Sequence, residues 1–126
     1  MEINDPEIVA ELRELYPRYE TALVTNDART LTEMFWNSPE TIRFGTTENL
    51  HGFEEIANFR KTRAAVNLHR TISRMDVVTF GRDFGSVTLE FERVVNGQTV
   101  FGRQSQVWAR VAEGWRIVSA HVSILP

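Results

Sequence analysis

The sequence contains no cysteine, and this absence excludes several kinds of chemistry at once. Without cysteine there can be no disulfide, no thiolate nucleophile and no thiolate metal ligand. Long apolar runs are also missing, since no stretch approaches the roughly 20 residues that a membrane-spanning helix needs. The first residues lack the basic region and apolar run of a signal peptide. The sequence therefore predicts a cytoplasmic protein that does not bind membranes.

Lysine is almost absent as well: the chain has 14 basic residues, and all of them except Lys61 are arginines. The formal net charge is only −3, and the aromatic residues are not interleaved with a basic run, so nucleic-acid binding is not expected. Arginine offers a planar set of donors that matches carboxylates, and it keeps its charge when partly buried. Codon bias in a GC-rich genome explains the same composition, so arginine content alone does not decide the matter.

Motifs for metals, cofactors and nucleophiles are missing too. The three histidines have no spacing, with one another or with carboxylates, that is typical of a metal cluster. No nucleophile elbow, phosphate loop or dinucleotide fingerprint is present. A chain of 126 residues, 42% hydrophobic and 25% charged, has the size and balance of one globular domain. We therefore expect a single domain over residues 1–126, without metal or cofactor.

The first half of the chain is predicted to be mainly helical. Asp5 and Pro6 mark a helix start, because the aspartate side chain caps the first turn and proline lacks an N–H that would go unpaired there. Apolar residues then recur at helical spacing, and Pro17 is expected to bend this helix. The expected elements are a helix over 6–25, a second helix after Asn26 and Asp27, a short strand over 40–44 and a third helix over 53–65.

From His69 onward the apolar pattern changes to a period of two. Strands are expected over 68–80, 84–95, 98–111 and 115–124, joined by tight hairpin turns. Long antiparallel strands twist and curl, and the helices must cover the concave side to bury their apolar faces. The predicted fold is α+β: a curved antiparallel sheet wrapped around three N-terminal helices, shaped as a cone with a pocket at its wide end.

The convex face of such a sheet has no helices to cover it. We expect apolar side chains there to need another surface, which predicts a homodimer or a higher homo-oligomer through the open face of the sheet. The residues expected on that face are Val87, Leu89, Val118 and Val122.

Two arginines stand out in the third helix. Arg60 and Arg63 lie on the same side as Ile56 and Phe59, where a purely structural helix would carry leucine or alanine. Arginines on an inward face favour an anionic ligand. The alternative is that both reach out from the edge of the apolar face, or pair with a glutamate of the first helix such as Glu20.

Two more arginines lie in predicted strands. Arg43 alternates with Ile42 and Phe44 and so points away from them, and spacing alone slightly favours solvent. Arg103 belongs to the polar run over 102–106, in the middle of an expected central strand. Buried polar groups need partners, so one face of this strand is predicted to line either a pocket or a subunit interface.

His121 is the remaining candidate for chemistry. The alternation of the last strand places His121 on the same face as Trp115 and Ile117. A lone histidine near a strand end is commonly a hydrogen-bonded residue without catalytic function. Its titration near neutral pH nevertheless suits a proton donor, so both interpretations stay open.

Short motifs along nearly the whole chain resemble the AtzH-like family. They are RYETALVTND at 18–27, FW at 35–36, TIRFG at 41–45, ENLHG at 48–52, FR at 59–60 with Arg63, GRDF at 81–84, GRQSQ at 102–106 and WRIVSAHVS at 115–123. The resemblance implies a cystatin-like cone of the nuclear-transport-factor type. It also implies a link to an amidase, since members of the family accompany one in the catabolism of cyanuric acid or of purine-derived ureides.

The same resemblance implies an activity: decarboxylation of 1,3-dicarboxyurea, a small dianion, to allophanate, without a cofactor. The implied site residues are Arg43, Arg60, Arg63 and Arg103 as carboxylate ligands, Tyr19 or His121 as proton donor, Trp36, Phe44 and Phe59 as walls, and Asn49 and Ser123 on the urea oxygen. Because this fold also serves as a docking module, a non-catalytic partner of the amidase, or a module that only binds small acids, is the alternative. A hydratase or isomerase acting on another small acid is a third reading.

Overall fold

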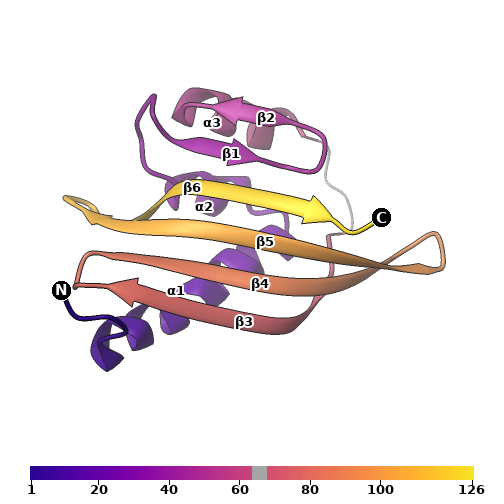
Figure 1. Cartoon of the computed structure of the whole chain (residues 1–126). Coiled ribbons are helices and arrows are strands. Elements are labelled where there is room, and N and C mark those ends of the chain that lie inside the picture. The colour runs from indigo at the N-terminus through magenta and orange to yellow at the C-terminus, as the bar shows by residue number, and fades with distance from the viewer. Residues whose placement is uncertain (64–67) are drawn as a thin grey trace.

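The computed structural model describes residues 1–63 and 68–126, which form an α+β fold as predicted. Figure 1 shows the helices behind one face of a broad sheet, whose other face is open toward the viewer. The elements are α1 (Pro6–Val24), α2 (Ala28–Glu33), β1 (Ile42–Phe44), β2 (Asn49–His51), α3 (Phe53–Thr62), β3 (Thr71–Phe80), β4 (Phe84–Val95), β5 (Gln98–Val111) and β6 (Gly114–Ile124).

The sheet has the strand order β2-β1-β6-β5-β4-β3. Strands β3 to β6 form the predicted antiparallel meander. Strand β1 joins the sheet beside β6 in a parallel pairing, and β2 pairs antiparallel with β1. The sequence did not predict β2, because a three-residue strand between turn residues is too short to show an alternation of two.

The first helix follows its predicted course. The side chain of Asp5 accepts a hydrogen bond from the backbone N–H of Glu7, and Pro6 occupies the first turn. Helix α1 continues past Pro17 to Val24. Its buried side chains recur at helical spacing and face the sheet: Ile8, Leu12, Tyr16, Tyr19, Ala22 and Leu23. Helix α3 ends earlier than expected, and positions 64 and 65 of the predicted helix lie outside the described residues.

The core lies between these helices and the concave face of the sheet. Trp108 and Ile117 are completely buried there. Val87 and Leu89, predicted on the open face, are also in this core, and Val122 packs against it, so that prediction was wrong for all three. Val87 and Leu89 alternate with exposed residues of β4, so the apolar side of this strand is its concave side. The open face still carries exposed apolar surface, including Phe101, which is 51% exposed.

A β-bulge in β6 reverses which face its side chains occupy. Val107 is paired with Ser119, but Trp108 is paired with Ile117, which leaves Val118 without a partner on β5. One extra residue in a strand shifts all later side chains to the opposite face.

The bulge explains why one sequence prediction failed. Ile117 is buried in the core, and Ala120, three positions later, is buried too. His121 is exposed, and it lies on the opposite face of the sheet from Ile117. The predicted sharing of one face by His121, Trp115 and Ile117 was therefore wrong, because strict alternation does not hold across the bulge.

A buried polar network ties α1 to the sheet. Arg70, just before β3, forms an ion pair of 2.8 Å with Glu20 of α1 and donates to Gln104 Oε1 of β5 at 2.9 Å. Gln104 Nε2 donates to the Tyr16 hydroxyl at 2.9 Å, and that hydroxyl donates to Glu20 at 2.8 Å. The Arg70 guanidinium also lies 4.2 Å from the centre of the Phe91 ring. Each polar group is hydrogen-bonded to another, and these bonds offset the free-energy cost of burying them.

The network controls the ionisation of its members. Burial acts to raise the pKa of Glu20, but the hydrogen bonds and charge of Arg70, with the bond from Tyr16, hold it below its usual value. Burial, followed by the charge of Glu20, raises the pKa of Tyr16. Burial acts to lower the pKa of Arg70, but its bond to Glu20 raises it overall. At neutral pH the network therefore holds a full ion pair.

Replacing Glu20 by Gln should lower the free energy of unfolding by about 2–3 kcal/mol at pH 7, because Arg70 would stay buried without a counter-charge. A carboxyl whose pKa is lowered by folding stabilises the protein above its unfolded pKa and loses this effect as the pH falls through the folded one. The deficit of Glu20→Gln should therefore shrink below about pH 4. Urea unfolding at several pH values measures both effects.

Glu33→Gln is the matched control, because Glu33 pairs with Arg29 on the surface, where their side chains are 64% and 88% exposed. This variant should change stability by less than about 0.5 kcal/mol. Equal losses of unfolding free energy in the two variants would mean that the buried Arg70 network stabilises the protein no more than a surface ion pair does.

Candidate functional site

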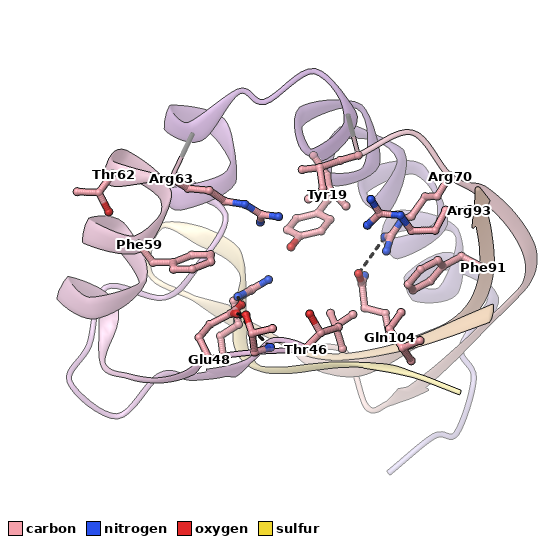
Figure 2. A pocket seen from close by; sticks show the side chains of 16 residues that line it. Tyr19, Thr46, Glu48, Phe59, Thr62, Arg63, Arg70, Phe91, Arg93 and Gln104 are labelled. Atoms are coloured by element: carbon pink, nitrogen blue, oxygen red, sulfur yellow. Dashed lines mark hydrogen bonds and ion pairs between the residues drawn. The ribbon is translucent and has the colours of Figure 1, made fainter. Parts of the chain in front are cut away.

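A cavity of about 340 Å³ lies between the helices and the concave face of the sheet. Helix α1 contributes Tyr19, β1 contributes Arg43, α3 and its end contribute Phe59 and Arg63, and β5 contributes Gln104. Figure 2 shows Tyr19, Arg63 and Gln104 directed toward the centre of this space. Its volume falls in the range of small-molecule sites.

Three guanidinium groups gather around one aromatic ring at this site. The guanidinium carbons of Arg43, Arg60 and Arg63 lie 5.5, 6.0 and 5.5 Å from the centre of the Phe59 ring. We call these three residues the arginine cluster. Among the residues that the structure describes, only one carboxylate pairs with the cluster, that of Glu48, 2.8 Å from Arg43. The ring stabilises cations over its face but cannot neutralise them, so the cluster keeps excess positive charge.

Arg60 is a buried member of the cluster. It is only 6% exposed, and its Nη2 donates to the Tyr19 hydroxyl at 3.2 Å. Its Nε has no hydrogen-bond partner within the described part of the chain. Burial lowers the pKa of Arg60, the Tyr19 hydroxyl opposes this, and the charges of Arg43 and Arg63 lower it further. Because Arg60 is a cation buried beside two other cations, the binding of an anion next to it is favoured.

The opposite end of the cavity carries residues that the sequence analysis missed. Arg70 and Arg93 line it together with Phe91, and Figure 2 shows them across the cavity from Arg63. Arg93 continues the inward alternation of β4 after Phe91, a signal that was available in the sequence. Arg70 lies before β3 in an irregular segment, where no periodic signal exists.

Positive charge exceeds negative charge around the whole cavity. Glu20 neutralises Arg70, and Glu48 neutralises Arg43. The arginines at or beside the cavity are Arg43, Arg60, Arg63, Arg70 and Arg93. Among the described residues, no carboxylate other than that of Glu48 is bonded to the arginine cluster. This excess of guanidiniums suits an anionic ligand, and the Tyr19 hydroxyl lies next to the arginine cluster, bonded to Arg60.

Arg103 and Ser123 lie on the other face of the sheet. Arg103 Nε donates to Ser123 Oγ at 3.1 Å, and the two residues face each other across β5 and β6. Gln104, the next residue, points into the cavity instead. The polar run of β5 does line a pocket, as expected, but with its glutamine and not with its arginine. The structure does not bring Arg103 or Ser123 to the cavity.

Four further predicted residues are also away from the cavity lining. The Phe44 ring lies 5.8 Å from that of His121 and 5.7 Å from that of His51, on the open face. Asn49 is paired with Phe44 and is exposed on that same side. Trp36 is half-buried near the start of β6, where its backbone N–H donates to Ile117. Of the predicted residues, the structure brings together Tyr19, Arg43, Phe59, Arg60 and Arg63.

Residues 1–63 and 68–126 contain no group of three or more His, Asp or Glu side chains that could hold a metal ion. None of their helices is both long enough and apolar enough to cross a membrane. The charged side chains that line the cavity are mainly guanidiniums, which suit carboxylates and other oxyanions.

Comparison with known proteins agrees with this description of the fold. A cystatin-like fold protein from Burkholderia xenovorans is 43% identical, covers 100% of this chain and 99% of its own, and superposes with a TM-score of 0.90. A protein of unknown function from Pectobacterium atrosepticum is 40% identical, covering 98% and 95%, with a TM-score of 0.91.

A nuclear transport factor 2-like protein from Salmonella enterica is 27% identical, covering 96% of this chain and 93% of its own, with a TM-score of 0.79. No curated protein sequence matches the chain. These structures share the cystatin-like and nuclear-transport-factor-like fold that the sequence predicted. The model of the AtzH-like family matches residues 1–126, and the chain therefore belongs to the AtzH-like family.

Proposed function

We propose that the protein is a cofactor-independent decarboxylase that converts 1,3-dicarboxyurea to allophanate in cyanuric acid catabolism. The observation that carries this proposal is the arginine cluster: three guanidiniums around Phe59, with Glu48 as their one bonded carboxylate among the described residues. A dianion suits such excess positive charge, and membership of the AtzH-like family favours this substrate. A cytoplasmic location and a link to an amidase of the same route are part of the proposal.

The proposed reaction needs one bond cleavage and one proton transfer. The bond between a urea nitrogen and its carboxylate carbon breaks, carbon dioxide leaves, and the bonding electron pair stays on the nitrogen and is delocalised into the urea carbonyl. The arginine cluster holds the carboxylate that is retained. Tyr19 then gives its proton to the nitrogen and recovers one from solvent.

Arg60 prepares Tyr19 for this role. The Tyr19 hydroxyl accepts a hydrogen bond from Arg60 Nη2, so its own proton is directed elsewhere. Figure 2 shows the hydroxyl pointing into the cavity. The cation beside it also stabilises the phenolate that proton transfer leaves behind. His121, on the open face, becomes the natural control for this assignment.

Purified protein should accelerate the loss of carbon dioxide from freshly generated 1,3-dicarboxyurea above the rate in buffer. Tyr19→Phe should lower kcat by roughly a hundredfold and leave KM nearly unchanged, as expected when a general acid is removed. His121→Asn should leave both constants near those of the parent protein. Loss of activity in His121→Asn alone would reverse the assignment. No acceleration by the parent protein would favour a non-catalytic partner of the amidase or a small-acid-binding module.

Arg60→Lys should keep the fold and lose at least roughly tenfold in kcat/KM, because lysine cannot reproduce the planar set of donors of a guanidinium. Arg103→Lys is the matched control, since Arg103 bonds Ser123 on the open face. Steady-state kinetics and circular dichroism of both variants test this. Unchanged turnover in Arg60→Lys would move the anion site elsewhere.

We also propose that two copies associate through the open face of the sheet. This face lacks helical cover in Figure 1 and exposes apolar side chains such as Phe101, whereas Val87 and Leu89 are buried and are not available. Light scattering at micromolar concentration should give the mass of a dimer, and Phe101→Glu should shift it toward that of a monomer. A parent protein that is monomeric under these conditions would contradict the proposal.

A further inference from the structure

Glu48 occupies a place at Arg43 that an anionic ligand would need. Its Oε1 lies 2.8 Å from Arg43 Nη1, and both side chains line the cavity. The Arg43 side chain is only 6% exposed and that of Glu48 18%. Arg43 Nε has no hydrogen-bond partner within residues 1–63 and 68–126. The pair is thus a buried contact in which the arginine has donor capacity left over.

The local backbone leaves room for this carboxylate beside Arg43. The N–H of Gly45 donates to the carbonyl of Glu48 at 2.9 Å, which folds the chain back so that the Glu48 side chain passes over Gly45. A methyl group at Gly45 would overlap Glu48 Oε1 and would lie 3.1 Å from Arg43 Nη1. Only a residue without a side chain leaves this space open.

Thr47 holds the other oxygen of the same carboxylate. Its hydroxyl and its backbone N–H donate to Glu48 Oε2 at 2.6 and 3.3 Å. Burial acts to raise the pKa of Glu48, but the bonds from Thr47 and Arg43 hold it below its usual value. Glu48 is therefore ionised at neutral pH, and an incoming carboxylate meets a negative charge as well as the arginines.

Two carboxylates cannot both bind the same guanidinium edge without strong repulsion, so one must move. Thr46 and Thr47 are exposed, and the turn that carries Glu48 lies at the solvent side of the cavity lining. Rotation of Glu48 breaks a buried ion pair and its bonds to Thr47, and this cost is offset when water solvates the Glu48 carboxylate and the ligand carboxylate takes its place at Arg43. Rotation of Glu48 into solvent would give Arg43 to the ligand and raise the excess positive charge of the cluster.

We propose that Glu48 is an internal counter-ion that competes with anionic ligands for Arg43 and is displaced when one binds. The inference rests on the proposed function in that it takes a carboxylate as the ligand of the cluster. It deepens that function, because the return of Glu48 to Arg43 would also help a product carboxylate to leave. Glu48 then lowers the affinity of the site for anionic ligands, because each of them must displace the same negative charge from Arg43.

The test measures binding of malonate, a small dicarboxylate, by isothermal titration calorimetry. Glu48→Gln should bind malonate roughly tenfold more tightly than the parent protein, because the competing charge is gone and Arg43 is released. Gly45→Ala should bind more tightly too, since the added methyl group expels the Glu48 carboxylate while its charge remains in the chain. Glu55→Gln, which changes an exposed carboxylate bonded to the backbone of His51, should leave the affinity unchanged.

The double variant Gly45→Ala/Glu48→Gln adds a stricter criterion. If both changes act by removing the Glu48 carboxylate from Arg43, the double variant should bind malonate no more tightly than Glu48→Gln alone. Independent gains that add up would overturn the inference, because they would require two separate mechanisms.

The remaining outcomes separate this inference from the proposed function. If the parent protein binds malonate or decarboxylates its substrate, but Glu48→Gln and Gly45→Ala bind no more tightly, Glu48 only positions Arg43 and the inference is wrong while the function stands. Tighter binding by both variants without any decarboxylation by the parent protein would keep the inference and reject the function. Absence of malonate binding in every variant would overturn the competing role of Glu48.

Discussion

The ion pair between Arg70 and Glu20 is the contact on which the cavity depends. It joins helix α1 to the sheet through Gln104 and Tyr16, with each polar group satisfied by another. Because α1 also carries Tyr19, the same contact fixes the hydroxyl that points into the cavity. Burying a charge pair stabilises a fold only when every partner is present, so this network sets both the stability of the helix and the geometry of the site.

The network also divides the cavity into two electrostatic ends. At one end Glu20 neutralises Arg70, whose guanidinium rests on the Phe91 ring. At the other end three guanidiniums share Phe59, and the charge of Arg43 alone is balanced, by Glu48. Both ends are lined by guanidiniums, since Arg93 lies beside Arg70, and the arginine cluster differs in that Glu48 is its one bonded carboxylate among the described residues.

One extra residue in β6 decides which of its side chains lie on each face of the sheet. The bulge at Val118 keeps Ile117 in the core and directs His121 to the open face, beside Phe44. Without it, the last strand would present its histidine to the cavity and its apolar residues to solvent. The cavity is therefore lined by tyrosine and arginine side chains, while His51, His121 and exposed apolar residues lie on the face that we propose for association.

Much of this protein could be predicted from its sequence. Helical spacing located α1 and α3, alternation located β3 to β6, and residue order implied the family; Arg60 and Arg63 were found because they interrupt an apolar helix face. These signals are local, since each depends on the period of one element.

Other features needed the tertiary structure. Arg70 reaches Glu20 across 50 positions, and Glu48 reaches Arg43 only because the chain folds back at Gly45. The bulge that moves His121 to the open face is defined by its pairing with β5, which no pattern within β6 reveals. Periodicity determines which elements form, whereas the facing of a side chain and the pairing of a charge depend on neighbours that are distant in the sequence.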